Sequence, residues 1–262
     1  MYQNNISFAG AGKVAEALSK ELFHAGYGID LIVSRTEQKG SLLAASVKAE
    51  WSSELVFPES TKVIIVSVPD HSLKDVLYSI RCNPDTLAAH TAGSFGLDIF
   101  PEHLRHKGIF YPLQTFSQNR KVNFTDLPVL LEASDEESAG ILKSLAESLF
   151  AKIYFVDTSQ RIMLHLAAVF ACNFTNHMFT AGKEIASKAD FQFDILVPLI
   201  KETVEKAIEA GPENSQTGPA VRHDNNTIEK HLDLLSFSPE LQGIYKNITQ
   251  SIMEYYKKPL SR

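Results

Sequence analysis

Short apolar runs rich in β-branched residues alternate with helical patterns over the first 156 residues. One run, Val63-Ile64-Ile65-Val66, is continuously apolar, as expected for a strand that is buried on both faces. Alternation of this kind is typical of a sheet built from βαβ units. We therefore expect about eight strands, at Ile6–Ala9, Asp30–Ser34, Val47–Trp51, Lys62–Val68, Leu87–His90, Gly108–Leu113, Pro128–Glu132 and Lys152–Val156.

Helical periodicity lies between these runs. Apolar residues recur at positions 14, 18, 22 and 25 before Gly26 ends the pattern, which predicts a helix directly after the first strand. Asp70 is expected to cap a helix that runs to about Arg81, and Asp135 to precede another.

After Asp157 the strand-like runs disappear, and four helical segments follow at about 158–188, 194–210, 224–235 and 239–257. Gly211-Pro212 and Ser238-Pro239 separate them. A chain of 262 residues is long enough for two domains with separate cores. We expect an α/β protein with a doubly wound sheet domain over 1–156 and an all-helical domain over 157–262.

The stretch from Ile162 to Gly182 contains no Asp, Glu, Lys or Arg, so it has to be considered as a membrane span. Polar side chains such as His165, Asn173 and His177 interrupt it and would need partners inside lipid. We therefore expect no membrane span but a helix buried all round, within a domain or a dimer interface. Because a large apolar surface is rarely left in water, we expect a homodimer through the helical domain.

The composition changes this picture little. With 44% hydrophobic and 21% charged residues the chain is typical of a globular protein, and a net charge of −6 without a basic cluster argues against nucleic-acid binding. Cys82 and Cys172 have no ligand-like spacing, so we expect no metal site. The first residues lack the pattern of a signal peptide, which favours a cytoplasmic location.

The sharpest local signal is GAGKVA, which follows the first predicted strand and opens the first predicted helix. Gly10 can make the tight turn, Gly12 lets a pyrophosphate approach the backbone, and Ala15 permits close helix–sheet packing. The helix N-terminus then offers free N–H groups to the phosphates. This context predicts a Rossmann-type dinucleotide site; its cofactor-binding residues here are Gly10, Ala11, Gly12, Lys13 and Val14.

The choice of cofactor depends on the end of the second strand, beside the adenosine ribose. Asp30 lies at the other end of that strand, roughly 13 Å from Ser34 at ~3.3 Å per residue. Ser34, Arg35 and Thr36 can instead bind a 2′-phosphate, so NADP is favoured over NAD. The alternative is that Arg35 stacks on the adenine or points to solvent.

The carboxyl ends of the central strands should line the nicotinamide end of the crevice, because ligands bind there in open α/β sheets. These residues are Val68 and Pro69 after one strand, and Thr91 and Ala92 after the next, with Ser94 towards the substrate. For any one of them, an ordinary strand-to-loop transition is the alternative.

The motifs GAGKVA, SRT and VPD, with the helical second half, resemble the NADP-dependent reductase superfamily that includes pyrroline-5-carboxylate reductase, 3-hydroxyisobutyrate dehydrogenase and deazaflavin-dependent NADP reductases. More closely, Tyr111–Phe116, His165–Asn173 and Thr217–Asp224 are similar to a family of Rossmann-like proteins with a helical C-terminal domain of unknown function. The resemblance implies NADP as cofactor and a helical domain like the C-terminal domain of 6-phosphogluconate dehydrogenase.

A reductase of this kind keeps its proton donor in the helical half. His165 and Asn173 are 8 residues apart on one predicted helix, ~12 Å along its axis and about 80° around it. His165 can transfer a proton and Asn173 can orient a carbonyl or imine. Hydroxyacid dehydrogenases of the superfamily place a catalytic Lys where Val169 stands, so their mechanism does not carry over. The alternative for His165 is a buried, hydrogen-bonded core or interface residue.

Three residues between two predicted helices, Gln216, Thr217 and Arg222, resemble the loop that closes on substrate in pyrroline-carboxylate reductases. Arg222 can pair with a substrate carboxylate. Alternatively, Arg222 forms a structural salt bridge while Asp224 caps the next helix. Gln114 can reach the crevice from the end of a strand, or it braces the backbone.

The sequence thus favours an NADP(H)-dependent oxidoreductase that acts on a small carboxylated carbonyl or imine compound. A non-catalytic NADP-binding regulator or sensor is the main alternative, because the superfamily lysine is missing and a fold does not dictate function. Hydride exchange with a deazaflavin is a third hypothesis that no residue specifically demands.

Overall fold

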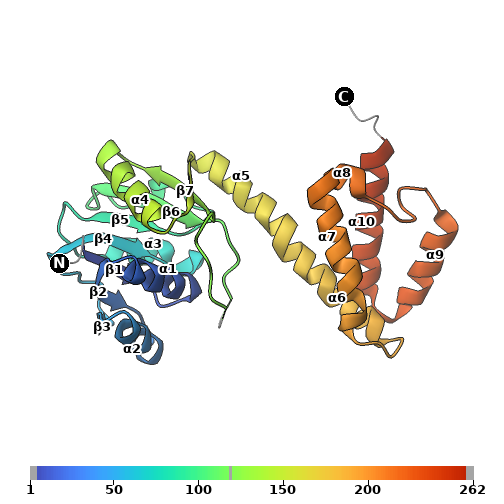
Figure 1. Ribbon diagram of the computed structural model, residues 1–262, viewed down its shortest axis with the longest axis horizontal. Helices are drawn as coiled ribbons and strands as arrows, with labels where there is room; N and C mark the ends of the chain where they lie inside the picture. Colours follow the sequence, from blue (N-terminus) through green and yellow to red (C-terminus); the bar gives the residue numbers. More distant parts are fainter. Residues whose placement is uncertain (1–4, 118–119, 258–262) are drawn as a thin grey trace. The chain divides into compact units, whose positions relative to one another are not determined.

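The computed structural model describes residues 5–117 and 120–257 (Figure 1). Its chain contacts divide into two compact units, one up to Asn173 and the other from Phe174. We call them the sheet unit and the helical unit and describe each by itself.

The sheet unit contains one eight-stranded sheet in the order β3-β2-β1-β4-β5-β6-β7-β8. All neighbouring strands are parallel except β6 and β7, which pair antiparallel. The chain leaves β1 in one direction for β2 and β3, and returns to the other side of β1 for β4, so the topological switch point lies between β1 and β4. The strands are β1 (Asn5–Ala9), β2 (Gly28–Val33), β3 (Glu50–Ser52), β4 (Thr61–Val66), β5 (Leu87–His90), β6 (His106–Pro112), β7 (Pro128–Ala133) and β8 (Lys152–Phe155).

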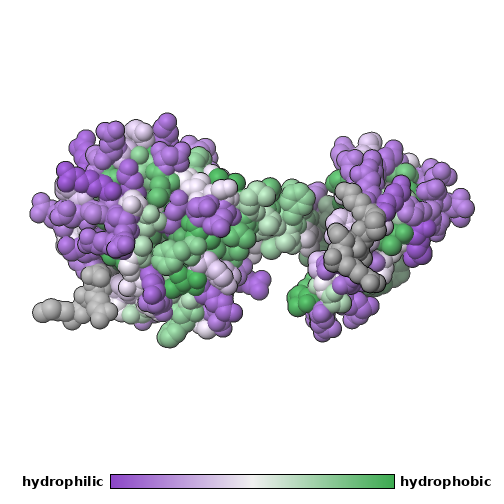
Figure 2. Space-filling model, turned by 90° about the horizontal axis from the view of Figure 1, so that it is seen from above, coloured by the Kyte–Doolittle hydropathy of each residue, from purple (hydrophilic) through white to green (hydrophobic). Residues whose placement is uncertain are grey.

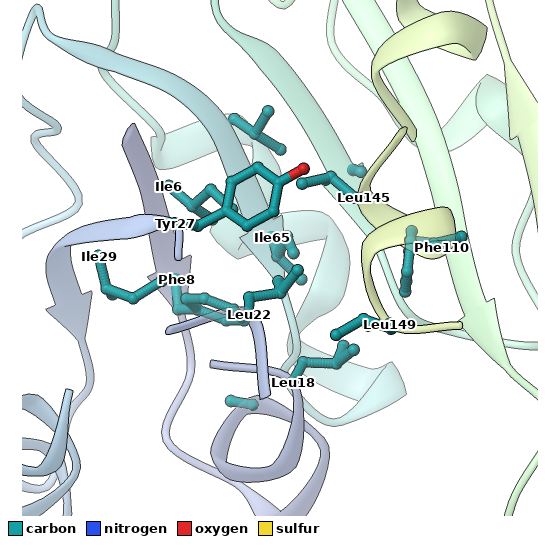
Figure 3. Packing of buried hydrophobic residues seen from close by; sticks show 14 of the residues in the cluster. Ile6, Phe8, Leu18, Leu22, Tyr27, Ile29, Ile65, Phe110, Leu145 and Leu149 are labelled. Atoms are coloured by element: carbon teal, nitrogen blue, oxygen red, sulfur yellow. The ribbon is translucent and has the colours of Figure 1, made fainter. Parts of the chain in front are cut away.

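Helices cover both faces of this sheet, and alternate residues of a strand therefore enter different cores. In β4, Val63 and Ile65 belong to one buried cluster, whereas Ile64 and Val66 belong to the other. The first cluster packs under α1 (Lys13–His24) and α4 (Glu136–Ser148), whose side chains meet those of β1, β4 and β6 in Figure 3. The second packs under α3 (Asp70–Ser79). This arrangement confirms the doubly wound α/β fold.

The predicted strands are all present, and each except β3 starts and ends within two residues of its expected bounds. β3 begins at Glu50 because Val47 still ends α2 (Glu37–Ser46), a helix that the sequence did not reveal. Only Gly40, Leu43 and Ala44 of α2 are buried, so it carries little amphipathic signal.

Of two helix starts expected from the sequence, one is confirmed and the other is wrong. Asp135 is the N-cap of α4, as expected, and its side chain accepts a hydrogen bond from the Ser138 N–H at 2.8 Å. For α3, Asp70 is the first helical residue and Pro69 takes the cap position, without a side-chain cap. The prediction of Asp70 as a cap was therefore wrong, and α3 ends at Ser79 instead of Arg81.

The helix α5 (Thr158–Ala168) is fixed to the sheet at its first turn. Asp157 forms a capping box with Gln160. The Thr158 hydroxyl donates to the carboxylate of Glu132 in β7 at 2.7 Å. Arg161 is fully buried, forms an ion pair with Glu132 and donates a hydrogen bond to the carbonyl oxygen of Phe95. This is why the contacts assign the helix up to Asn173 to the sheet unit, although strands give way to helices near residue 157, where we placed the domain boundary.

The helical unit contains the remaining elements and confirms the all-helical second half. Its helices are α6 (Thr175–Ser187), α7 (Val197–Ala210), α8 (Pro212–Ser215), α9 (Asn225–Leu234) and α10 (Pro239–Lys257). The single turn α8 was not expected. Of the described apolar residues in this unit, the buried ones are Ala220, Leu235 and Leu241.

The helical stretch from Thr158 to Ser187 combines α5, a π-helical segment at Val169–Phe174 and α6. By length and composition it could cross a membrane, and none of its most apolar window is buried. Apolar side chains follow it in the middle of Figure 2; Met163 is 62% exposed and Leu166 46%. The described chain therefore does not bury this helix by itself, which leaves the dimer interface as the alternative. The expectation of a dimer interface remains a prediction.

We expect Arg161→Met to lower the free energy of unfolding of the sheet unit by about 3–5 kcal/mol, because it leaves the Glu132 carboxylate unpaired in a largely buried place. The double variant Glu132→Gln with Arg161→Met should recover part of this loss, since no charge is then left unpaired. Urea unfolding followed by circular dichroism measures both changes. A loss below about 1 kcal/mol for the single variant would contradict the structural importance of this ion pair.

Candidate functional site

The turn between β1 and α1 brings two backbones unusually close together. Gly10 has a φ of +118°, and a Cβ atom there would lie 2.1 Å from the carbonyl oxygen of Ser67 at the end of β4. Its N–H donates to the carbonyl oxygen of Val33 in β2 at 2.7 Å. The turn is thereby tied to the ends of both strands that flank β1, and only glycine fits.

Gly12, in contrast, lies next to open space. It is the N-cap of α1 with φ −82°, and a Cβ atom there would have no neighbour within 4 Å. No side chain caps the helix, so the first amide groups of α1 keep their hydrogen-bonding capacity for a ligand.

A cavity of about 210 Å³ opens over these strand ends, at the switch point between β1 and β4. It contains eight of the twelve residues that the sequence assigned to the cofactor, namely Gly10, Ala11, Gly12, Ser34, Arg35, Thr36, Val68 and Pro69. The remaining lining comes from Ala9, Val33, Lys39, Ser53, Leu55, Ser67, Ser72 and Val76. Among the described residues that line it, none is Asp or Glu.

The other four predicted cofactor residues lie beside the cavity. Lys13 lines a neighbouring groove between α1 and α2, and Val14 packs against the core. Thr91 donates a hydrogen bond to the hydroxyl of Ser67, a lining residue, at 3.2 Å. Ala92 is buried directly after it.

The polar side chains just after β2 differ in their contacts. The Ser34 hydroxyl donates to the carbonyl oxygen of Thr36 at 3.0 Å and accepts from the indole N–H of Trp51 at 3.1 Å. It therefore braces the loop. Arg35 and Lys39 are exposed, and within the described ranges neither forms an ion pair.

Asp30 lies away from this cavity, as predicted. Its carboxylate accepts hydrogen bonds from the hydroxyls of Ser60 and Thr61, at 3.1 and 3.3 Å, where β4 begins. Lys39, in the first turn of α2, was missed because α2 itself was missed. Its charge, four residues after Arg35 in the sequence, was the signal that could have found it.

A second group of side chains lies near the carboxyl ends of β5 and β6. The hydroxyl of Tyr111 is 2.8 Å from Nδ1 of His165, and the two rings meet edge to face at 75°. A Cβ atom on Gly93 would come within 2.6 Å of Nδ1, so the loop after β5 accommodates the imidazole only because residue 93 is glycine. The sequence assigned His165 a catalytic role but gave none to Tyr111.

Burial raises the pKa of the Tyr111 hydroxyl, the negative charge of Asp70 raises it further, and the positive charge of Arg161 opposes both. Tyr111 is therefore protonated at neutral pH. His90, at the end of β5, stays neutral: burial and the charge of Arg161 lower its pKa to about 3, against a hydrogen bond with the Gly96 backbone. Its Nδ1 then accepts from the Ala92 N–H at 3.2 Å, which helps shape this loop.

The remaining predicted site residues have mostly local contacts. Asn173 is exposed and lies in the π-helical segment, whose i→i+5 bonding changes the winding, so the regular helix assumed for the 80° angle to His165 is not present. Ser94 is exposed. Gln114 accepts hydrogen bonds from the N–H and hydroxyl of Thr115, at 2.8 and 3.3 Å, which supports its bracing role.

The predicted substrate loop lies in the helical unit. Gln216 donates to the carbonyl oxygen of Thr217 at 3.0 Å, and Arg222 is exposed. Asp224 caps α9 by accepting from the Thr227 N–H at 3.1 Å. Their role towards a substrate stays a prediction. Within residues 5–117 and 120–257, no three His, Cys, Asp or Glu side chains are placed to hold a metal ion.

Comparisons with known proteins agree with this geometry. Residues 5–91 match the family described as "NADP oxidoreductase coenzyme F420-dependent", and residues 127–252 match "Domain of unknown function (DUF2520)". None of the curated proteins compared with the chain matches it.

Solved structures extend the match to the whole chain. The crystal structure of a "putative NADP oxidoreductase" from Bacteroides fragilis is 40% identical over 96% of this chain and 98% of that one, with a TM-score of 0.88. Protein TM1727 from Thermotoga maritima is 23% identical over 97% and 100%, with a TM-score of 0.78. An imine reductase from Myxococcus stipitatus in complex with NADP+ is 15% identical over 97% and 93%, with a TM-score of 0.64. The last two share the fold, and together these matches confirm the resemblance predicted from the motifs.

The two glycines of the turn should respond differently to alanine. We expect Gly10→Ala to destabilise the sheet unit by at least about 1–3 kcal/mol, because its φ is positive and its Cβ would meet backbone. Gly12→Ala should leave the melting temperature nearly unchanged but weaken NADPH binding by about tenfold or more, because its methyl group projects where the pyrophosphate is expected. Thermal unfolding and titration calorimetry separate the two effects. Equal NADPH affinity in Gly12→Ala and the wild type would contradict a pyrophosphate at this turn.

Proposed function

Because the chain belongs to the same NADP oxidoreductase family as the Bacteroides fragilis protein, with an F420-dependent-type NADP oxidoreductase domain followed by a DUF2520 domain, we propose that it binds NADP(H) and reduces or oxidises a small carbonyl or imine compound. The observation that carries this proposal is the cavity over the β1–α1 turn. This cavity combines the uncapped N-terminus of α1, which suits a phosphate, with Arg35 and Lys39 beside the expected ribose. Neither cation forms an ion pair within the described residues.

The residues that line the cavity fit a dinucleotide with an additional phosphate. The uncapped amides after Gly12 suit the pyrophosphate. Arg35 and Lys39 suit the 2′-phosphate, and the lack of Asp or Glu among the described lining residues leaves no group that favours the free ribose hydroxyl of NAD. NADP is therefore the cofactor we propose.

The chemistry then divides between cofactor and protein. The nicotinamide, when bound, supplies or takes up a hydride. His165 supplies or accepts the accompanying proton, and Asn173 orients the carbonyl or imine. We propose Ser94, Gln114, Gln216, Thr217 and Arg222 as substrate-binding residues, with Arg222 directed to a substrate carboxylate.

A second candidate function is NADP-dependent regulation without turnover. Val169 favours it, because related hydroxyacid dehydrogenases have a catalytic lysine at this position. Assays with NADPH and cyclic imines or 2-oxo acids, and with NADP+ and hydroxy acids, distinguish the two functions. NADPH binding without turnover of any of them would favour the regulator. Adding a deazaflavin cofactor to the same assays tests hydride exchange with that group.

We further propose that two copies of this chain form a dimer through the apolar helix and the helical unit. The exposed side chains along Thr158–Ser187 support this, as does an apolar groove of about 260 Å³ lined by α6 and α7. A second copy supplies matching apolar surface in an isologous contact. We propose that the protein works in the cytoplasm, which suits its oxidoreductase fold.

We expect Arg35→Ala and Lys39→Ala each to weaken NADPH binding by about 10-fold to 100-fold and to leave NADH binding within about twofold, because each removes a charge-assisted hydrogen bond to the 2′-phosphate. Lys62→Ala, at the opposite end of β4, is the matched control and should bind both nucleotides as the wild type does. Titration calorimetry at two salt concentrations measures these effects. Equal losses for NADPH and NADH would contradict 2′-phosphate recognition.

The dimer is tested by adding charge to the apolar helix. We expect light scattering to give twice the mass of one chain for the wild type and the mass of one chain for Met163→Glu and Leu166→Glu, because a buried unpaired carboxylate opposes association. Leu42→Glu makes the same change at a 68% exposed leucine of α2 and should remain dimeric. A monomeric wild type at micromolar concentration would overturn this proposal.

A further inference from the structure

The position of His165 is determined by contacts that lie outside any cofactor site. Arg161 and His165 are four residues apart in α5 and therefore share one face of the helix. Because Arg161 is fully buried against Glu132 and Phe95, this face is turned to the sheet. His165 is thereby brought to the loop after β5 and to the end of β6.

The two nitrogens of the imidazole differ in their surroundings. Nδ1 is enclosed, with the Tyr111 hydroxyl at 2.8 Å and the Cα atom of Gly93 beside it. Nε2 has no hydrogen-bond partner among the described residues. The enclosed nitrogen can therefore hold the ring in place, while the other nitrogen is available to a ligand.

We propose that Tyr111 is a positioning residue for proton transfer by His165: its hydroxyl holds Nδ1 in both protonation states of the ring, so that Nε2 is the atom that exchanges a proton with the substrate. This inference rests on the proposed oxidoreductase function and adds the atom and the partner through which His165 works.

A tyrosine hydroxyl suits this task because its oxygen can accept a hydrogen bond from Nδ1–H whether the ring is neutral or charged. Towards a neutral imidazole, the Tyr111 oxygen accepts from the Nδ1–H, which keeps the single ring proton on Nδ1 and leaves Nε2 free to accept a proton. Towards an imidazolium, the Nδ1–H donates to the Tyr111 oxygen. The ring thus keeps one orientation while its charge changes.

The proton balance of a reduction follows from this arrangement. The imidazolium releases its Nε2 proton to the nitrogen or oxygen of the substrate as the adjacent carbon gains a hydride, and the electron pair of the broken N–H bond stays on Nε2. The ring becomes neutral with its remaining proton on Nδ1, still bonded to Tyr111. Solvent then returns a proton to Nε2, and oxidation of an alcohol or amine runs through the same steps in reverse.

Tyr111→Phe tests this role because it keeps the aromatic ring and removes only the hydroxyl. The probes are the carboxylated cyclic imine 1-pyrroline-2-carboxylate and the oxo acid 2-oxobutyrate, each with NADPH. We expect kcat to fall by about 10-fold to 100-fold, with KM and the Kd for NADPH within about twofold of the wild type. Tyr154→Phe, on the exposed strand β8, is the matched control and should retain the wild-type kcat.

A double-variant cycle separates positioning from general support of the fold. If Tyr111 acts through His165, then Tyr111→Phe costs no further activity in a His165→Gln background. Additive losses in the two variants, or a loss confined to KM and NADPH affinity, would overturn the proposal.

Nuclear magnetic resonance of ¹⁵N-labelled histidine examines the pair without any substrate. We expect neutral His165 to carry its proton on Nδ1, and the Nδ1 resonance to move towards that of a free imine-type nitrogen in Tyr111→Phe. An unchanged Nδ1 resonance would overturn the proposal. If the wild type binds NADPH but reduces neither probe nor any other carbonyl or imine, the oxidoreductase function and the proton-transfer role fail together. The ¹⁵N resonances of His165 then still decide whether Tyr111 holds the ring.

Discussion

The close approach of the β1–α1 turn to the end of β4 is the constraint on which the cavity depends. At Gly10 the backbone passes so near the Ser67 carbonyl that no side chain fits, while the Gly10 amide bonds to Val33. One residue thus holds the ends of three strands together. The cavity above them has a floor of backbone, whose amide groups are already oriented towards an anion and need no rearrangement when it binds.

A second constraint gives the site its chemistry. The nucleotide cavity alone contains no group suited to transfer a proton, since its described lining has hydroxyls, cations and apolar side chains. The imidazole comes from the first helix after the sheet, and the Arg161–Glu132 ion pair helps to fix that helix one turn earlier. A buried ion pair adds little net stability compared with apolar packing, but it specifies one orientation of the helix, which is what a proton donor requires.

The fold was largely predictable because its signals are local. Strands buried on both faces appear as apolar runs, as in β4, and the glycine turn marks the start of the sheet. α2 escaped detection since it buries only small residues and Leu43 on its inner face, which leaves almost no periodicity. The surface that covers the Thr158–Ser187 helix was harder still to predict. The apolar composition of this stretch indicates that the helix is buried, but the described chain does not bury it. An apolar sequence pattern shows that a surface needs to be covered, but it does not identify the partner surface.

The candidate site was predictable where one segment supplies it and unpredictable where two segments meet. Ser34, Arg35 and Thr36 follow from their place after β2, although the structure shows that the Ser34 hydroxyl is occupied with Trp51, a partner 17 residues away. Tyr111 and His165 are 54 residues apart, and neither lies in a motif whose spacing requires the other. Their pairing depends on which strand faces α5, and this in turn depends on the antiparallel insertion of β7, since Glu132 of β7 anchors the helix. A tyrosine at the carboxyl end of a central strand and a histidine on an uncharged helix are separately ordinary. They become a candidate proton-transfer pair only when the topology brings them together.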